Sequence, residues 1–185
     1  LGAAIAIPVL LVDILKGAVA VLLALQFVAI WDRLPDLAGL LAALGAVLGH
    51  SLSPWVGFRG GKGAATAVGA LSVIQPLVLL PMFLVWVVTL VLTGWVGLAT
   101  ILSGLSLVPA FAVFDPARGH LVFAALLALF LVFTHRENIA HLGQDGIDIA
   151  GCVGSLEGCH VDRDIVVVVE GLVHALDEVV HGRHL

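Results

Sequence analysis

The residues best suited to chemistry form a glycine-rich segment directly before an apolar run. Three glycines surround one lysine in this segment: Gly60, Gly61, Lys62 and Gly63. Glycines leave backbone N–H groups free to form an anion-binding nest, and the N-terminus of a following helix adds positive potential. Arg59 and Lys62 supply full charges that suit a phosphate, and Thr66 adds a hydroxyl one helical turn later. The segment predicts phosphate binding, with a flexible cytoplasmic turn carrying positive-inside charges as an alternative of equal weight.

The spacing in this segment differs from that of a nucleotide-hydrolysing P-loop. A Walker A motif reads Gly-x-x-x-x-Gly-Lys-Ser/Thr. This chain has Val56 at the position of the first glycine and Gly63 at the position of the hydroxyl residue. Nucleotide hydrolysis by this segment is therefore excluded.

The amino-acid composition indicates whether these residues belong to a soluble or a membrane protein. Hydrophobic residues make up 61% of the 185 residues and charged residues 11%, with a mean hydropathy of +1.18. A soluble domain has about 45–50% apolar and about 25% charged residues. The excess is too large for one water-soluble core, so the sequence predicts a membrane protein.

The apolar residues occur in long runs, and a spanning helix needs about 20 of them. We interpret about six runs as helices, of which the fourth is short and runs into the third through Pro81: Ala3–Ile30, Leu37–Leu52, Ala64–Leu80, Met82–Leu92, Trp95–Phe114 and His120–Phe133. The predicted fold is an all-α polytopic transmembrane bundle.

Charges near the apolar runs give an orientation and a second polar site. Basic residues concentrate in cytoplasmic loops, so Arg59, Lys62 and Arg136 place the glycine-rich segment and the end of the last helix on the cytoplasmic side. Asp13 and Lys16 are spaced i, i+3 inside the first run, where charges are costly and usually face a cavity or one another. They either line a polar vestibule or pair helices structurally.

The chain divides into a bundle, residues 1–142, and a short acidic tail, residues 143–185. The tail has eight acidic residues against Arg163 and Arg183, which gives no sign of nucleic-acid binding. Cys152 and Cys159 lack zinc-finger spacing, so metal binding by the tail is a minor alternative. A frameshift or a domain junction would explain the change in composition.

Three stretches together resemble the bacterial acyl-phosphate:glycerol-3-phosphate acyltransferases. The first is Gly-His-x-x-x-Pro followed by Phe-x-Gly-Gly-Lys-Gly-x-Ala-Thr, residues 49–66. The second is Leu-Val-Asp-Ile-Leu-Lys-Gly, residues 11–17, and the third is His-Arg-Glu-Asn-Ile, residues 135–139. The resemblance covers roughly residues 8–142.

The resemblance implies an enzyme of phospholipid synthesis in the bacterial inner membrane. It would transfer an acyl group from acyl-phosphate to the 1-hydroxyl of glycerol 3-phosphate, giving lysophosphatidic acid. The implied partners are these two substrates, the lipid bilayer and an enzyme that produces acyl-phosphate. The resemblance implies no metal and no cofactor.

The resemblance also implies roles for single residues. Lys62 and the loop amides would hold a substrate phosphate and stabilise transition-state charge. His50 and His135 are candidate general bases, because imidazole titrates near neutral pH, although an interfacial place without catalysis is an even alternative. Asn138 would bind the glycerol hydroxyls or cap the last helix. Further substrate-binding candidates are Arg59, Gly60, Gly61, Gly63, Thr66, Arg136, Asp13 and Lys16.

The sequence also departs from the family pattern. The family's first helix and its Gly-Ser-Gly-Asn loop would precede the Asp13 helix, and here only seven residues precede Pro8. The family's third loop, Thr-Arg-Tyr-x-Ser, reads Thr-Gly-Trp-Val-Gly at residues 93–97. A truncated, inactive relative that only binds membrane or partners is therefore the main alternative, and a small-solute transporter is a second one.

Overall fold

The computed structural model describes residues 3–31, 35–54, 57, 60–136 and 138. The predicted tail, residues 143–185, and Arg59 lie outside these described residues, so the division at residue 142 stays a prediction. In the described part every regular element is helical, which confirms the predicted all-α fold. The elements are α1 (Ala3–Trp31), α2 (Pro35–Ser51), α3 (Ala64–Ile74), the 3₁₀ turn η2 (Pro76–Val78), α4 (Leu79–Thr93), α5 (Val96–Leu105), α6 (Leu107–Phe114) and α7 (Arg118–Thr134).

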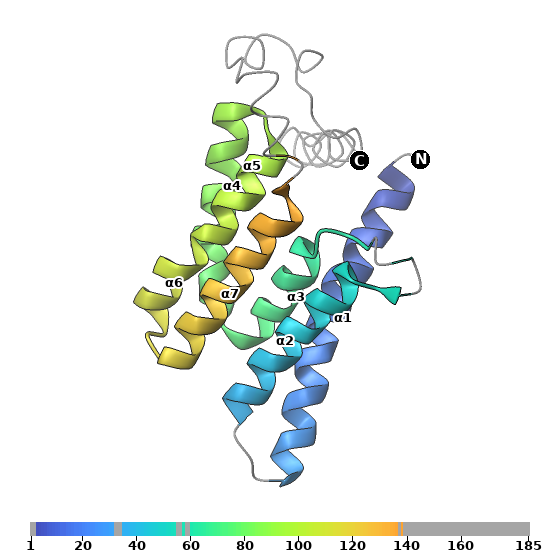
Figure 1. Ribbon diagram of the computed structural model, residues 1–185, viewed down its shortest axis with the longest axis vertical. Helices are drawn as coiled ribbons and strands as arrows, with labels where there is room; N and C mark the ends of the chain where they lie inside the picture. The colour runs from blue at the N-terminus through green and yellow to red at the C-terminus, as the bar shows by residue number, and fades with distance from the viewer. Residues whose placement is uncertain (1–2, 32–34, 55–56, 58–59, 137, 139–185) are drawn as a thin grey trace, which may run out of the picture.

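The helices run along one common direction and form a bundle (Figure 1). Helix α1 packs against α2 and α3, α4 packs against α5, and α7 packs against α5 and α6. The C-terminal ends of α2 and α7 lie at the same end of the bundle as the first residues of α3 and α5 (Figure 1). The glycine-rich segment, which connects α2 to α3, therefore lies among several helix ends.

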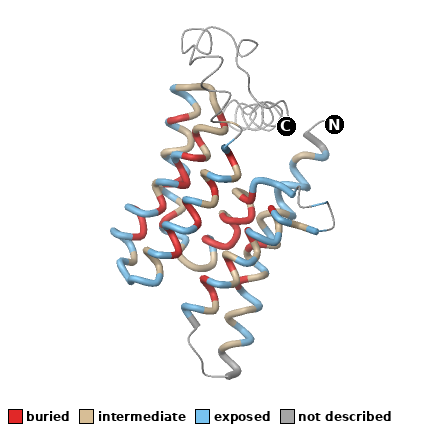
Figure 2. The backbone as a smooth tube through the Cα atoms, in the orientation of Figure 1, coloured by how far each residue is buried: buried red, intermediate tan, exposed pale blue. Residues whose placement is uncertain are grey.

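Three stretches are long and apolar enough to cross a membrane by length and composition: Ile5–Val28, Pro76–Thr93 and Val96–Phe114. The remaining helices, α2, α3 and α7, are shorter but also apolar. Many large hydrophobic residues are exposed, and Figure 2 shows exposed positions along most of the helices. Such a surface suits a hydrocarbon environment, in which helices satisfy their own backbone groups.

The predicted third run, Ala64–Leu80, is not one helix, because it is interrupted after Ile74. Helix α3 ends where the Gln75 N–H donates to the Leu71 carbonyl at 2.9 Å. Pro76 follows, and a proline disfavours helical geometry in the preceding residue, which here has φ −153° and ψ 84°. Pro81 lies in the first turn of α4, where a missing N–H removes no intrahelical hydrogen bond.

The predicted fifth run, Trp95–Phe114, is divided into α5 and α6 at Ser106. The Ser106 hydroxyl donates to the Ser103 carbonyl at 2.7 Å, which satisfies an acceptor at the break. Pro109 lies in the first turn of α6 and supplies no N–H to the preceding turn. Proline is a usual cause of such interruptions.

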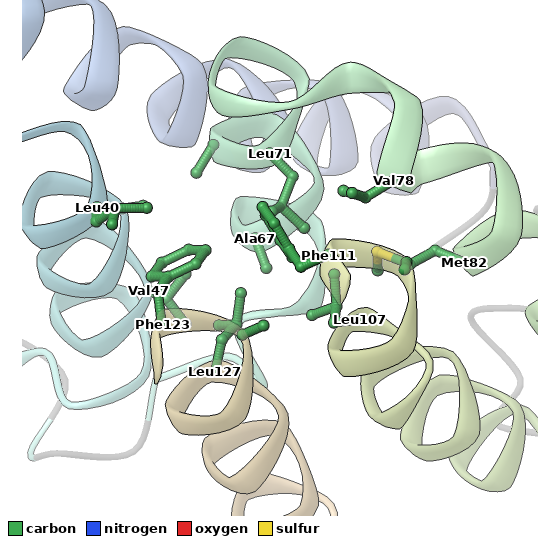
Figure 3. Packing of buried hydrophobic residues seen from close by; sticks show 14 of the residues in the cluster. Leu40, Val47, Ala67, Leu71, Val78, Met82, Leu107, Phe111, Phe123 and Leu127 are labelled. Atoms are coloured by element: carbon green, nitrogen blue, oxygen red, sulfur yellow. The ribbon is translucent and has the colours of Figure 1, made fainter. Parts of the chain in front are cut away.

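The packed interior is a contiguous cluster of small and branched apolar side chains in which several helices meet (Figure 3). Phe111 and Leu71 are fully buried in it, and the Phe123 ring meets the Phe111 ring edge-on with centroids 6.1 Å apart. Other labelled members of the cluster are Leu40, Val47, Ala67, Val78, Met82, Leu107 and Leu127. Small residues let the helices approach closely, so the cluster fixes the relative positions of the helix ends that carry the polar residues.

Helices α1 and α3 cross with their backbones in direct contact. A Cβ atom added at Gly17 would lie 2.1 Å from the Thr66 carbonyl oxygen. One added at Gly69 would lie 1.8 Å from the Ile14 carbonyl oxygen. Only glycine fits at either position, as in other close crossings of membrane helices. This close contact fixes where the α1 turn that carries Asp13 and Lys16 lies relative to the glycine-rich segment.

Candidate functional site

The glycine-rich segment lies directly on the C-terminal turn of α2. The Gly60 N–H donates to the Ser51 carbonyl at 3.1 Å. A Cβ atom at Gly60 would lie 2.0 Å from the His50 carbonyl oxygen, and one at Gly61 would lie 2.2 Å from His50 Nε2. Gly60 therefore excludes a side chain, because the obstacle is backbone, whereas a side chain at Gly61 would displace the His50 ring. Because neither glycine has a side chain, the loop backbone lies directly against His50.

The segment leads into α3 through Gly63, which has φ +82° in the left-handed region that favours glycine. Among the described residues, no side chain caps this end of α3 by a hydrogen bond. The first N–H groups of a helix have no intrahelical acceptor, and they attract anions together with the helix dipole. The start of α3 beside Lys62 thus has the geometry of an anion-binding site.

Lys62 joins this segment to the end of α7. Its Nζ donates to Asn138 Oδ1 at 3.1 Å, and its backbone carbonyl accepts a hydrogen bond from Thr134 Oγ1 at 3.0 Å. The lysine side chain is exposed. Because an amide oxygen carries no formal charge, this contact places the ammonium without neutralising it, and Lys62 remains available to an anion.

Asp13 and Lys16 meet His50 across the helix interface. The Lys16 Nζ lies 2.5 Å from Asp13 Oδ1 and contacts His50 Nδ1. The Asp13 carboxylate lies 3.9 Å from the same ring nitrogen. An ammonium only donates, so Nδ1 of His50 is the acceptor, and the proton of the neutral imidazole lies on Nε2. In this arrangement His50 presents a donor, not a base, toward Gly61.

His135 is bound differently and follows the last residue of α7. It is buried, and its Nδ1 lies 2.9 Å from the Leu131 carbonyl oxygen. A carbonyl only accepts, so Nδ1 carries the proton of the neutral ring and Nε2 keeps a lone pair. Burial lowers the pKa of His135 from its ordinary value, the hydrogen bond to Leu131 partly opposes this change, and the Lys62 charge lowers the pKa further. The arrangement holds His135 neutral and basic at Nε2.

The lowered pKa of His135 predicts a pH dependence of stability. The folded protein binds this proton less readily than the unfolded chain, whose histidine pKa is about 6.5. The contribution of neutral His135 to the free energy of unfolding is fully present above pH ~6.5. It is lost as the pH falls through the lowered pKa of the folded state. Between pH 7.5 and 5, the melting temperature of the natural protein should fall a few degrees more than that of His135→Gln. Parallel falls in the two proteins would contradict this.

Two other predicted substrate ligands are placed elsewhere by the structure. Thr66 is fully buried at the crossing of α1 and α3, and its hydroxyl has no hydrogen-bond partner in the part of the chain that the structure describes. The Arg136 guanidinium turns back to its own helix, donating to the Phe133 carbonyl at 3.1 Å and covering the Phe133 ring at 4.4 Å. Substrate binding by these two residues, and by the undescribed Arg59, stays a prediction.

Three residues of this region have structural roles that the sequence did not reveal. Thr134 anchors the loop through its hydroxyl, and the only sequence signal was its place beside His135. Gly97 lies against the Asn138 side chain. Gly94 ends α4 with φ +67°, and the Trp95 N–H that follows donates to Thr93 Oγ1 at 3.2 Å. In the sequence, Gly94 marks a turn after Thr93, and both glycines depart from the third-loop pattern of the family.

An apolar groove of about 320 Å³ separates α2 from α7. It lies in the half of the bundle opposite the glycine-rich segment, because its lining residues belong to the first parts of α2 and α7. Its lining consists of apolar side chains with one arginine at the far end: Leu37, Leu40, Leu41, Leu44, Arg118, Gly119, Val122, Phe123 and Leu126. The groove has the size of the smaller ligand pockets found in proteins.

Fold and site together define a polytopic α-helical membrane protein with a cationic, glycine-rich loop at one end of its bundle. The family model of glycerol-3-phosphate acyltransferase matches residues 1–145. The chain therefore belongs to the glycerol-3-phosphate acyltransferase family, which confirms the resemblance seen in the sequence.

Individual relatives agree with this assignment. A glycerol-3-phosphate acyltransferase of Desulforamulus reducens is 41% identical over 134 residues, which are 72% of this chain and 64% of the relative. One of Rhodospirillum rubrum is 39% identical over 140 residues, which are 75% and 64%. The crystal structure of PlsY (YgiH), an integral membrane glycerol 3-phosphate acyltransferase, in its glycerol 3-phosphate form has a TM-score of 0.66 at 33% identity and covers 75% of this chain and 67% of its own. The chain thus spans slightly less than two thirds of the length of the two sequence relatives.

Proposed function

We propose that the protein transfers an acyl group from acyl-phosphate to the 1-hydroxyl of glycerol 3-phosphate and releases lysophosphatidic acid and phosphate. The observation that carries this proposal is the uncapped start of α3, where Lys62 is presented by glycines and oriented by Asn138. Both substrates carry a phosphate that such a site would bind. PlsY, a structural relative, has been crystallised in a glycerol 3-phosphate form and a lysophosphatidic acid form.

The chemistry requires one nucleophilic attack and one proton transfer. The 1-hydroxyl oxygen attacks the acyl carbonyl carbon, the bond from that carbon to the phosphate oxygen breaks, and inorganic phosphate leaves. Lys62 and the free N–H groups of α3 would stabilise the negative charge on the phosphate. His135 Nε2 or an oxygen of the departing phosphate accepts the hydroxyl proton, and His50 Nε2–H is suited to donate to a substrate oxygen.

The groove between α2 and α7 supports a substrate with a long acyl chain. Between His50, at the loop, and Leu37, at the far end of the groove, α2 rises by ~20 Å at about 1.5 Å per residue. This length exceeds the ~15 Å of hydrocarbon in one leaflet. On α2 the groove is lined by residues from Leu37 to Leu44, so it would receive the distal part of an acyl chain that leaves the phosphate site and runs along α2.

Location and partners follow from the proposed reaction. A product lipid and an acylated donor both belong in a bilayer, and the three basic residues Arg59, Lys62 and Arg136 favour a cytoplasmic position for the loop. The proposed location is the bacterial inner membrane. The donor must come from an enzyme that makes acyl-phosphate, which is the proposed partner.

An assay of the purified protein in lipid vesicles tests the proposal. With acyl-phosphate and glycerol 3-phosphate, lysophosphatidic acid and inorganic phosphate should appear in equal amounts. Glycerol in place of glycerol 3-phosphate should give little product, because it lacks the phosphate that the loop would hold. Absence of turnover by folded protein would refute acyl transfer, and it would favour the inactive relative.

A further inference from the structure

The charged turn of α1 lies beside the proposed site. Asp13 and Lys16 are the only charged residues in the sequence of α1, and charges within a membrane helix are costly. They pair with each other at 2.5 Å, so their ion pair stays within one helix and joins no second element. Among the described residues, the hydrogen bond that leaves this turn runs from the Lys16 ammonium to His50 Nδ1 on α2. The turn therefore acts on α2 through His50.

Lys16 differs from Lys62 in what surrounds its ammonium. The Asp13 carboxylate offsets the Lys16 charge, and the ammonium also donates to His50. The Lys62 ammonium has an uncharged partner instead, Asn138 Oδ1 at 3.1 Å. A substrate phosphate is therefore attracted to Lys62, while Lys16 acts as a hydrogen-bond donor to a ring nitrogen.

The His50 ring connects this donor to the glycine-rich segment. A Cβ atom added at Gly61 would lie 2.2 Å from His50 Nε2 and 2.7 Å from its Cε1, so the Nε2 end of the ring meets the segment. The hydrogen bond at one ring nitrogen sets which nitrogen carries the proton. Because Nδ1 accepts from Lys16, Nε2 carries it. Lys16 thereby determines that His50 presents a donor to the segment.

The crossing of α1 and α3 fixes the place of Lys16. The next residue, Gly17, lies against the backbone of α3, where an added Cβ would be 2.1 Å from the Thr66 carbonyl oxygen and 3.1 Å from the Ala70 nitrogen. Thr66 belongs to the first turn of α3, directly after the glycine-rich segment. Since backbone meets backbone here, the Lys16 turn and the segment are held in one fixed relation.

We infer that Lys16 is a positioning residue for the proposed reaction and not a ligand of the substrate. Held by Asp13, its ammonium fixes the His50 ring with Nε2–H toward the glycine-rich segment, where this donor would reach an oxygen of the bound substrate. The inference rests on the proposed function for its ligand, glycerol 3-phosphate. The hydrogen bond from Lys16 to His50 is itself independent of acyl transfer.

Two paired substitutions test the inference in the purified protein in lipid vesicles. Asp13→Leu/Lys16→Met, the apolar pair, removes the donor without leaving a charge unpaired, a replacement that buried ion pairs often tolerate. Asp13→Asn/Lys16→Gln, the amide pair, removes both charges but keeps an N–H that can donate to His50 Nδ1. The matched control is Gln26→Leu, a polar-to-apolar change at an exposed position of α1.

The first readout is the tautomer of His50, observed by ¹⁵N NMR of protein labelled at its histidine nitrogens, with the signals assigned by their loss in His50→Gln. At about pH 8, where histidine is mostly neutral, the natural protein, the control and the amide pair should show the Nε2–H form alone. The apolar pair should show both tautomers, because no donor holds Nδ1 as an acceptor. An Nδ1–H form in the natural protein, or a single tautomer in the apolar pair, would overturn the inference.

The second readout is binding of glycerol 3-phosphate, measured by isothermal titration without acyl donor. The apolar pair should bind about fivefold more weakly or worse, because small misplacements of a positioned group have large effects. The amide pair should bind within about threefold of the natural protein, and the control within about twofold, because the donor to His50 is kept. In the His50→Ala background, the apolar pair should change binding less than about twofold, because Lys16 acts through the ring.

The contrary outcomes are equally definite. Natural affinity in the apolar pair, equal losses in both pairs, or an undiminished loss in the His50→Ala background would overturn the inference, the last two by showing that the Lys16 charge binds the phosphate directly. If the apolar pair fails to fold, the amide pair decides, since a charge role predicts lost affinity and a donor role predicts kept affinity.

Failure of the inference is distinguishable from failure of the proposed function. If the tautomer and binding patterns hold without any lysophosphatidic acid formation, the inference stands and acyl transfer fails. If lysophosphatidic acid forms but the His50 tautomer is the same in the natural protein and the apolar pair, acyl transfer stands and the inference fails.

Discussion

Replacing Lys62 with alanine is expected to lower kcat/KM for lysophosphatidic acid formation by about 10²- to 10³-fold. Removing one preorganised donor from a developing negative charge has an effect of this size in other enzymes. Lys62 is suited to such a role because its ammonium is exposed and is oriented at 3.1 Å by an uncharged amide oxygen. The measurement is the initial rate of product formation at several concentrations of each substrate.

Two further variants make the Lys62 result specific. Lys62→Arg keeps the positive charge but replaces a compact ammonium with a planar fork, so a partial loss is expected. Gln26→Ala removes an exposed polar side chain on α1, far along the helix from the loop, and should leave the rate within twofold. If Lys62→Ala kept more than a third of the natural rate, the assignment of Lys62 to phosphate binding would be wrong.

Replacing Gly69 with alanine is expected to destabilise the protein by ~1–3 kcal/mol, the usual cost of overpacking. The added Cβ would lie 1.8 Å from the Ile14 carbonyl oxygen, and backbone cannot move aside as a flexible side chain can. Helix α1 must shift away from α3, which also displaces Asp13 and Lys16 from His50. The melting temperature in detergent should fall by about 5 °C or more.

Gly45→Ala provides the matched comparison for this substitution. An added Cβ at Gly45 meets no atom of the described residues within 4 Å, and alanine favours the helix by up to about 1 kcal/mol. Its melting temperature should be equal to that of the natural protein or slightly higher. An unchanged melting temperature in Gly69→Ala would show that α1 and α3 do not cross as closely as described.

The sequence by itself determined the class of protein and the location of its best motif. Apolar runs of membrane-spanning length indicate helices, because a bilayer leaves backbone groups no other means of satisfying their hydrogen bonds. The glycines around Lys62 indicate a backbone open to an anion, which is a local property. The break at Gln75 and Pro76 is equally local, but the predicted third run continues past it because the residues on both sides are apolar.

Only the tertiary structure decided which polar groups face one another. His50 and His135 looked equivalent in the sequence, yet contacts with an ammonium and with a carbonyl give their rings opposite tautomers. Thr66 looked accessible beside the loop, but the α1–α3 crossing encloses it.

The same holds for the glycines in contact with other helices. A side chain at Gly17, Gly69 or Gly97 would meet atoms that lie far away in the chain, such as the Asn138 side chain beside Gly97. Helical periodicity tells which residues share a face of one helix. It carries no information about the partner across a crossing, because packing of the whole bundle sets the rotation and depth of each helix.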